Sequence, residues 1–168
     1  MTFTYQTTRL SVAEVLNDTQ SDDVLMTITQ LLSAKVVENL PADFQQIDSV
    51  VDAQRWLTSM VSKSRIFMVK DKETGAIIGF VFLSVSDSFD AHIGYLLGEQ
   101  SWGKGYATEL LEGLIQFVQG ENVIKCLVAG VAPDNVVSSK LLLKLGFSKK
   151  VGGSNSSIFY QYPLSTMS

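Results

Sequence analysis

The most informative stretch of this sequence is "GYLLGEQSWGKGYATE", Gly94 to Glu109. An apolar run typical of a strand leads into a glycine-containing turn, and an apolar stripe at helical spacing follows from residue 106 to 119. Glycines let the backbone approach a ligand closely, and the first amides of a helix have no partner within the helix. The sequence therefore predicts a turn that binds an anion at a helix N-terminus.

Two nucleotide-binding loops compete with this interpretation. Gly98, Gly103 and Lys104 match the G-x-x-x-x-G-K of an ATP-binding phosphate loop, but Gly105 stands where Mg²⁺ needs a hydroxyl. The dinucleotide fingerprint G-x-G-x-x-G/A has Thr108 at its third small position and fits less well. A metal-free turn that binds a pyrophosphate through backbone amides fits better than either loop. An ordinary tight turn without a ligand is the simplest alternative.

The remaining chain predicts one α+β domain, residues 1–168, in which helices cover a central sheet. Only three prolines interrupt it, and no repeat or linker divides it. Strands are expected at 9–15, 65–70, 76–85, 91–97, 123–131, 147–151 and 157–164, and helices at 21–36, 50–61, 106–119 and about 135–146. Gly120 and Gly146 are expected to end the last two helices.

The composition excludes several classes of protein. With 46% hydrophobic residues and a net charge of −4, the chain can form a core but has no general attraction for nucleic acid or an anionic membrane. Its single cysteine, Cys126, has apolar neighbours, and no intramolecular disulfide can form. The start does not resemble a signal peptide, and no run of about 18 apolar residues occurs. We expect a cytoplasmic protein without nucleic-acid or membrane partners.

On these motifs the chain resembles the GNAT superfamily of acyl-CoA-dependent N-acetyltransferases, in its branch of ribosomal-protein N-terminal (alanine/serine) acetyltransferases. The family signature Q/R-x-x-G-x-G/A falls on Trp102–Ala107, and tryptophan at its first position is usual in that branch. "NVVSSKLLLKLGF", residues 135–147, is similar to the family's N-x-x-[AS]-x-x-x-x-x-K-x-G-F helix. "TTRLSVAEV" and "AQRWL" are similar more loosely. The resemblance implies a mostly antiparallel mixed sheet of about seven strands, with a splayed parallel pair and about four flanking helices.

The resemblance also implies acetyl-CoA as cosubstrate and no metal. Amides from about Gly103 to Thr108 would bind the pyrophosphate of CoA, a backbone donor near Leu97 would meet the thioester carbonyl, and Asn135 would lie near the pantetheine. Trp102 is expected to pack beneath the loop. The side chain of Lys104 would be solvated or near a phosphate. The cofactor-binding residues implied are Leu97, Trp102, Gly103, Lys104, Gly105, Tyr106, Ala107, Thr108 and Asn135.

The implied reaction transfers acetyl directly to an amine, either a protein N-terminal α-amine or a small-molecule amine. A protonated amine cannot attack, so a base is required. His92 is the candidate because histidine exchanges a proton near neutral pH, and strand alternation places it on one face with Gly94 and Leu96, opposite Tyr95 and Leu97. A histidine that only fills the strand, Asp90 as base, or catalysis by positioning alone are the alternatives.

The departing thiolate would take a proton from an acid. Many members of the family have a tyrosine where this chain has Leu142, but in the ribosomal branch a serine matching Ser138 has that role. A serine that only helps to cap the helix is the alternative. Tyr160 and Tyr162 are expected to be packing residues.

Two other functions stay open on the sequence. One is a non-catalytic sensor or regulatory module that binds acyl-CoA, and the other is a Mg²⁺-dependent nucleotide hydrolase. Acceptor choice is expected to depend on residues 22–60 and on the "GGSNSS" turn at 152–157. Relatives in this branch are often dimeric, and nothing in the sequence decides between a monomer and a homodimer.

Overall fold

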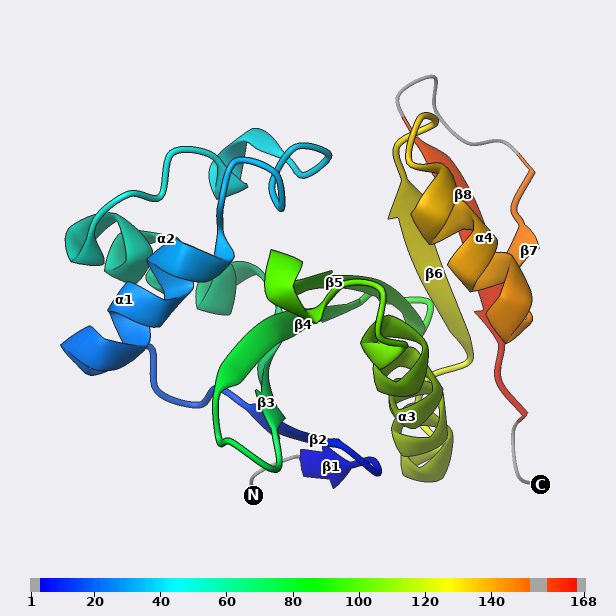
Figure 1. The fold of residues 1–168 in the computed structure, drawn as a ribbon. Helices are drawn as coiled ribbons and strands as arrows, with labels where there is room; N and C mark the ends of the chain where they lie inside the picture. The colour runs from blue at the N-terminus through cyan, green and yellow to red at the C-terminus, as the bar shows by residue number, and fades with distance from the viewer. Residues whose placement is uncertain (1–3, 152–156, 166–168) are drawn as a thin grey trace.

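The computed structural model describes residues 4–151 and 157–165, and these form one sheet with helices on both faces (Figure 1). The strands lie in the order β1-β2-β3-β4-β5-β6-β8-β7. They are β1 (Thr4–Gln6), β2 (Leu10–Glu14), β3 (Arg65–Asp71), β4 (Ile77–Val85), β5 (Asp90–Leu97), β6 (Cys126–Val131), β7 (Ser148–Lys149) and β8 (Ile158–Pro163). The helices are α1 (Asp22–Leu31), α2 (Val50–Lys63), α3 (Tyr106–Glu121) and α4 (Val136–Leu145), with short 3-10 turns η1 (Ala42–Phe44) and η2 (Glu99–Ser101).

The predicted mixed fold is confirmed. Neighbouring strands are antiparallel except for β5 and β6, which are parallel because α3 crosses over between them. The sheet has eight strands in the part of the chain described, rather than about seven. The strand missed at the N-terminus, β1, has only three residues and buries none of them fully, so it leaves no hydrophobic alternation to detect.

The two faces of the sheet carry separate hydrophobic clusters. One cluster joins the sheet to α3 and α4 and includes Leu97, Leu111 and Leu142. The other joins it to α1 and α2 and includes Leu57 and Leu96. Figure 1 shows α1 and α2 beside β4 on one side and α3 on the other. The predicted alternation of β5 is therefore confirmed, because consecutive leucines pack in opposite clusters.

Three helix ends differ from the prediction, and one of them is that of α2, which runs to Lys63 rather than to residue 61. α1 ends at Leu31 rather than at residue 36, and the chain continues in turns. Gly120 does not stop α3: the helix runs to Glu121, and Asn122 takes the left-handed conformation with φ of 55°. Asparagine tolerates this conformation better than most side chains, so it ends the helix in glycine's place.

A β-bulge sets the position of the end of β5. The register between β3 and β4 shifts after Val69, so that Ile78 is the extra residue and Gly79 follows it. Gly79 pairs with Leu97, and a Cβ at Gly79 would lie 2.1 Å from the carbonyl oxygen of Leu96. The backbones approach so closely here that only glycine fits.

Candidate functional site

Strands β5 and β6 diverge halfway along β5. They pair only from Asp90 with Cys126 to Ile93 with Ala129, whereas β6 continues to pair with β8 as far as Val131. Figure 1 shows β6 running away from the end of β5. Residues 94–97 therefore keep β4 as a neighbour but have left β6, as expected for a splayed parallel pair.

The backbone of Leu97 faces the side from which β6 has diverged. The N–H of Gly98 donates to the carbonyl of Ile78 in β4 at 2.9 Å. Because successive residues of a strand direct their polar groups to opposite sides, the N–H and C=O of Leu97 point away from β4. The amide of Leu97 is therefore a backbone donor directed toward the divergence.

Trp102 does not pack beneath the loop as expected. Its side chain is 42% exposed, and its indole Nε1–H donates to the carbonyl of Leu97 at 2.8 Å. Leu97 is buried, so its carbonyl needs a hydrogen-bond partner, and β6 cannot provide one because it no longer pairs with β5 at this residue. The physical role of Trp102 is thus to satisfy this carbonyl from the loop side.

The predicted glycine turn is present at the start of α3, and it is called the anion turn below because an anion is expected to bind there. Gly103 and Gly105 have φ of 72° and 81°, a region that strongly favours glycine. Gly105 is the N-cap residue and provides no side-chain cap, and the Glu109 N–H donates to its carbonyl at 3.2 Å. The amides of the helix's first three residues, 106–108, precede that bond and point out of the helix end, where an anion is favoured.

The start of α4 lies against the end of β5. The Asn135 side-chain oxygen accepts from the N–H of Ser138 at 3.3 Å and caps the helix. The Ser138 hydroxyl is 3.2 Å from the hydroxyl of Tyr95 on β5. Burial raises the pKa of Tyr95, although the hydrogen bond with Ser138 opposes the shift. The structure thus brings two hydroxyls together at the divergence.

Tyr95 belongs to the candidate site but was not predicted from the sequence. Its face of β5 could be predicted by alternation, but its contact with α4 could not, because 43 residues separate it from Ser138. No local signal marks such a pair.

His92 does not meet Ser138 on one face of the sheet. Alternation places His92 on the face of Leu96, whereas Tyr95, with Ser138, belongs to the face of α3 and α4. The His92 side chain is exposed, in the part of β5 that still pairs with β6. A group approaching from the α1 and α2 face would therefore reach His92 without displacing the core.

Arg9 contacts the anion turn from the far N-terminal part of the chain. Its Nη1–H donates to the carbonyl of Lys104 at 2.9 Å, and its Nε–H donates to the carboxylate of Glu109 at 2.7 Å. Its guanidinium also lies 4.1 Å from the ring centre of Tyr106. The segment "TTRLSVAEV" resembles the family only loosely, and no role for Arg9 could be predicted from it, because nothing local connects it to a turn 95 residues away.

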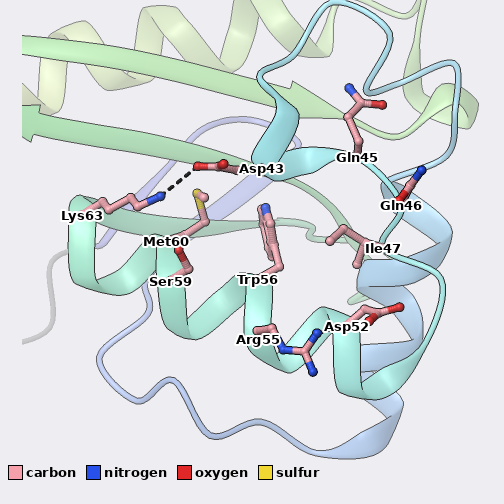
Figure 2. A pocket seen from close by; sticks show the side chains of 10 residues that line it. All are labelled: Asp43, Gln45, Gln46, Ile47, Asp52, Arg55, Trp56, Ser59, Met60 and Lys63. Carbon is pink, nitrogen blue, oxygen red and sulfur yellow. Dashed lines mark hydrogen bonds and ion pairs between the residues drawn. The ribbon is translucent and has the colours of Figure 1, made fainter.

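A pocket of about 400 Å³ lies apart from these residues, between η1 and α2 (Figure 2). Its rim carries the ion pair of Lys63 with Asp43 at 2.8 Å. Trp56 stands at its centre, 3% exposed, with an indole N–H that no group in the described ranges accepts. The rings of Phe44 and Phe80 surround it edge-on at 5.7 and 5.4 Å. None of the predicted catalytic or cofactor-binding residues lines this pocket, but most of its lining falls within residues 22–60, which were expected to influence acceptor choice.

Three remaining expectations concern the turn at 152–157, metal ligands and membrane-spanning helices. Most of the turn at 152–157 lies outside the described residues, so its part in acceptor choice stays a prediction. Over the same described ranges, no three His, Cys, Asp or Glu side chains form a group suited to a metal ion. No helix within them is long and apolar enough to cross a membrane.

Comparison with known proteins gives a family and several relatives. A family model described as "Acetyltransferase (GNAT) domain" matches residues 15–148. N-acetyltransferase p20 of Bacillus licheniformis is 35% identical over 94 residues, which are 55% of this chain and 53% of the relative. The [ribosomal protein uS5]-alanine N-acetyltransferase of Escherichia coli K12 is 36% identical over 87 residues, 50% of this chain and 45% of the relative. These matches thus span about half the length of each relative.

Solved structures share the fold. The RimL ribosomal L7/L12 alpha-N-protein acetyltransferase, in complex with coenzyme A, superposes with a TM-score of 0.79 at 14% identity and 98% coverage of both chains. The microcin C7 self-immunity acetyltransferase MccE, in complex with acetyl-CoA and AMP, gives 0.76 at 21% identity and covers 94% of this chain and 93% of its own. With its splayed parallel pair, its glycine turn and the family match over residues 15–148, this chain belongs to the GNAT acetyltransferase family.

Proposed function

We propose that this chain transfers acetyl from acetyl-CoA to an amine, with a protein N-terminal α-amine as the first acceptor class to test. The observation that carries the proposal is the backbone donor of Leu97 at the divergence of β5 and β6. The anion turn of α3 lies at the end of β5, and the Ser138–Tyr95 pair lies beside it. The relatives described as ribosomal-protein alanine N-acetyltransferases support the acceptor class.

The cosubstrate would be held mainly by backbone groups. The amides from Gly103 to Thr108 would bind the pyrophosphate, where the helix end favours negative charge. The pantetheine would extend past the end of β5. Asn135 has its side-chain oxygen engaged by Ser138, so its NH₂ group is the part left to donate to pantetheine. The side chain of Lys104 is not required, because the amides supply the donors.

The chemical step needs three groups on this chain. The neutral amine attacks the thioester carbonyl carbon, and a C–N bond forms while the carbonyl oxygen becomes negative. The Leu97 N–H would donate to that oxygen. The C–S bond then breaks, and Ser138 would give the sulfur its proton while a proton from water replaces it, so that the serine is neutral again when the amide and the free thiol leave. Burial raises the pKa of Tyr95, so its phenol keeps its proton at neutral pH and can hydrogen-bond to Ser138 as the serine loses its own.

His92 would take the proton from the amine through water, because five residues of β5, about 16 Å of extended strand, separate it from Leu97. It is exposed on the face opposite Ser138, so the amine would approach from the α1 and α2 side while the acid acts from the α4 side. Asp90, at the start of the same strand, is the alternative base.

Release of free thiol from acetyl-CoA tests the proposal. The purified chain is mixed with acetyl-CoA and with ribosomal-protein N-terminal peptides, polyamines or aminoglycosides. Ser138→Ala should lower kcat by about 10²-fold or more, in the range of one lost proton-transfer group. Ser139→Ala is the matched control, since the hydroxyl that pairs with Tyr95 belongs to Ser138 and not to this neighbouring serine. Tyr95→Phe should give a smaller loss than Ser138→Ala.

One result would favour the alternative function, that of a non-catalytic module, over the enzyme. If CoA binds saturably but no acceptor releases thiol above background, the chain is a non-catalytic acyl-CoA sensor or regulatory module. Equal rates for Ser138→Ala and Ser139→Ala would instead remove Ser138 as the acid while leaving the transfer reaction intact.

A further inference from the structure

The backbone of the anion turn is held from outside by a side chain that the reaction does not use. Arg9 lies in the turn between β1 and β2, and its Nη1–H donates to the Lys104 carbonyl at 2.9 Å. The peptide bond between Lys104 and Gly105 is trans, so its C=O and N–H point in opposite directions. A Lys104 carbonyl directed toward Arg9 therefore directs the Gly105 N–H away from Arg9.

The Gly105 amide then joins the first amides of α3. Gly105 is left-handed, with φ of 81° and ψ of 7°, and Tyr106 begins the right-handed helix. A left-handed residue next to a right-handed one turns successive N–H groups into one concavity that binds anions. We propose that Arg9 is a positioning residue for CoA, because its bond to the Lys104 carbonyl aims the Gly105 amide at the pyrophosphate. This inference rests on the proposed function.

Several contacts fix Arg9 in this position. Its Nε–H and its own backbone N–H donate to the Glu109 carboxylate, each at 2.7 Å, and the Thr7 hydroxyl donates to the same carboxylate. The guanidinium lies over the Tyr106 ring, whose hydroxyl donates to Asp71 at 3.2 Å. The fork of an arginine can make these contacts at once, whereas a lysine cannot. β1–β2, the β3–β4 hairpin and α3 are thus tied together at the turn.

The ion pair between Arg9 and Glu109 neutralises a negative charge that would oppose the binding of a pyrophosphate. Glu109 lies one turn into α3, close to the proposed pyrophosphate, and its carboxylate would repel a phosphate if it were unpaired. Its pKa is lowered: burial alone would raise it, but the hydrogen bonds from Thr7 and Arg9 outweigh burial. Glu109 is therefore ionised at neutral pH, and Arg9 neutralises it.

Binding of CoA and of pantetheine, which has no phosphate, tests the inference. Arg9→Gln should weaken CoA binding about tenfold in calorimetry, the loss of one oriented donor to a charged group. It should leave the pantetheine affinity unchanged in an NMR titration. Arg9→Lys keeps the charge without the fork and should bind CoA nearly as weakly as Arg9→Gln. Wild-type affinity in Arg9→Lys would overturn the inference, because charge alone would then suffice.

Lys72→Gln is the matched control. The Lys72 ammonium donates to the Thr7 carbonyl at 2.5 Å in the same turn, so this variant removes a positive charge there without touching the Lys104 carbonyl. It should bind CoA within about twofold of the wild type, which is less than 0.5 kcal/mol. A loss as large as that of Arg9→Gln would overturn the inference, since general disorder of the turn would then explain both.

A measurement on the unmodified chain keeps the inference testable if Arg9→Gln does not fold. On addition of CoA, the amide resonance of Gly105 should shift together with those of Tyr106 and Ala107. A Gly105 resonance that stays in place while the other two shift would overturn the inference. If the wild-type chain does not bind CoA, the proposed function fails and this inference fails with it. If the wild type and Arg9→Gln bind CoA equally, only the inference fails.

Discussion

Gly79→Ala is expected to destabilise the fold at the end of β5. The new Cβ would lie 2.1 Å from the carbonyl oxygen of Leu96 and 2.8 Å from a Leu97 methyl group. To reach about 3.0 Å, the shortest distance that a Cβ tolerates, the Leu96 carbonyl must move by about 0.9 Å. Overpacking against backbone falls at the upper end of the usual range, about 3 kcal/mol. For a chain of this size that lowers Tm by roughly 6–12 °C.

Gly94→Ala is the control for this substitution. Gly94 lies on the same pair of strands, opposite Phe82, and its new Cβ would find no atom nearer than 3.7 Å. Its unfolding free energy should stay within about 0.5 kcal/mol of the wild type, because ordinary contacts replace empty space. Both variants are measured by thermal and urea unfolding followed by circular dichroism. Equal stabilities for the two variants would refute the argument from close approach.

Displacement of the Leu96 carbonyl in Gly79→Ala is also expected to affect CoA binding. Leu97 follows Leu96 directly, so the Gly79→Ala shift should move the amide proposed to meet the thioester. CoA binding should therefore weaken in Gly79→Ala and not in Gly94→Ala, measured below the lower Tm.

Three further predictions concern the helices that flank the site. Gly105→Ala should lower the unfolding free energy by about 1–2 kcal/mol, because φ of 81° strains a side chain. Gly120→Ala is its control and should raise the unfolding free energy by about 0.5–1 kcal/mol, because Gly120 lies inside α3 with open space around it and alanine favours a helix over glycine. Asn135→Ala should cost about 1 kcal/mol by removing the cap of α4, and Asn135→Asp should restore most of it. The pKa of Glu109 is lower in the folded chain than its unfolded value, near 4.5. The stabilising contribution of Glu109 is therefore present above the unfolded pKa and is lost as pH falls through the folded pKa. The difference in unfolding free energy between the wild type and Glu109→Gln should shrink below about pH 4.5.

Each of these has a result that contradicts it. Stabilisation by Gly105→Ala, measured by urea unfolding, would mean that the turn does not need a left-handed residue. An Asn135→Asp variant no better than Asn135→Ala would assign the loss to something other than the cap. A wild-type minus Glu109→Gln difference that stays constant from pH 7 to pH 3 would show that Glu109 titrates alike in the folded and unfolded chains.

Local patterns predicted most of the elements correctly. The hairpin of β3 and β4, the strand β5, and helices α2, α3 and α4 were expected near their observed bounds, because each combines clear periodicity with a turn or capping residue. Short elements without periodicity, such as β1, were missed. The helix end at Asn122 was misplaced because glycine is the stronger signal of the two.

The site was predictable where it depends on backbone and not where it depends on distant side chains. The glycine-containing turn before α3 and the helix that begins near residue 135 were predicted from residue type and spacing. The Tyr95 hydroxyl and the Arg9 contacts depend on segments that meet only after the sheet has formed. The exposure of Trp102 was also out of reach, since it depends on a carbonyl that loses its strand partner. The limits of the domain at 1–168 and a homodimer stay predictions.

The join between β5 and β6 has a mechanical consequence. Within the described residues, four residue pairs, Asp90–Ile93 with Cys126–Ala129, join β1–β5 to the remaining strands, and of the two hydrophobic clusters described above the one on the α3 and α4 face spans this join. We therefore expect any bending between the two parts of the sheet to occur at this join, near Ile93. A ligand bound beyond the join would fasten the two parts together, and amide hydrogens of β6 should exchange more slowly when it is present. Binding of the substrate would then also make the sheet more rigid.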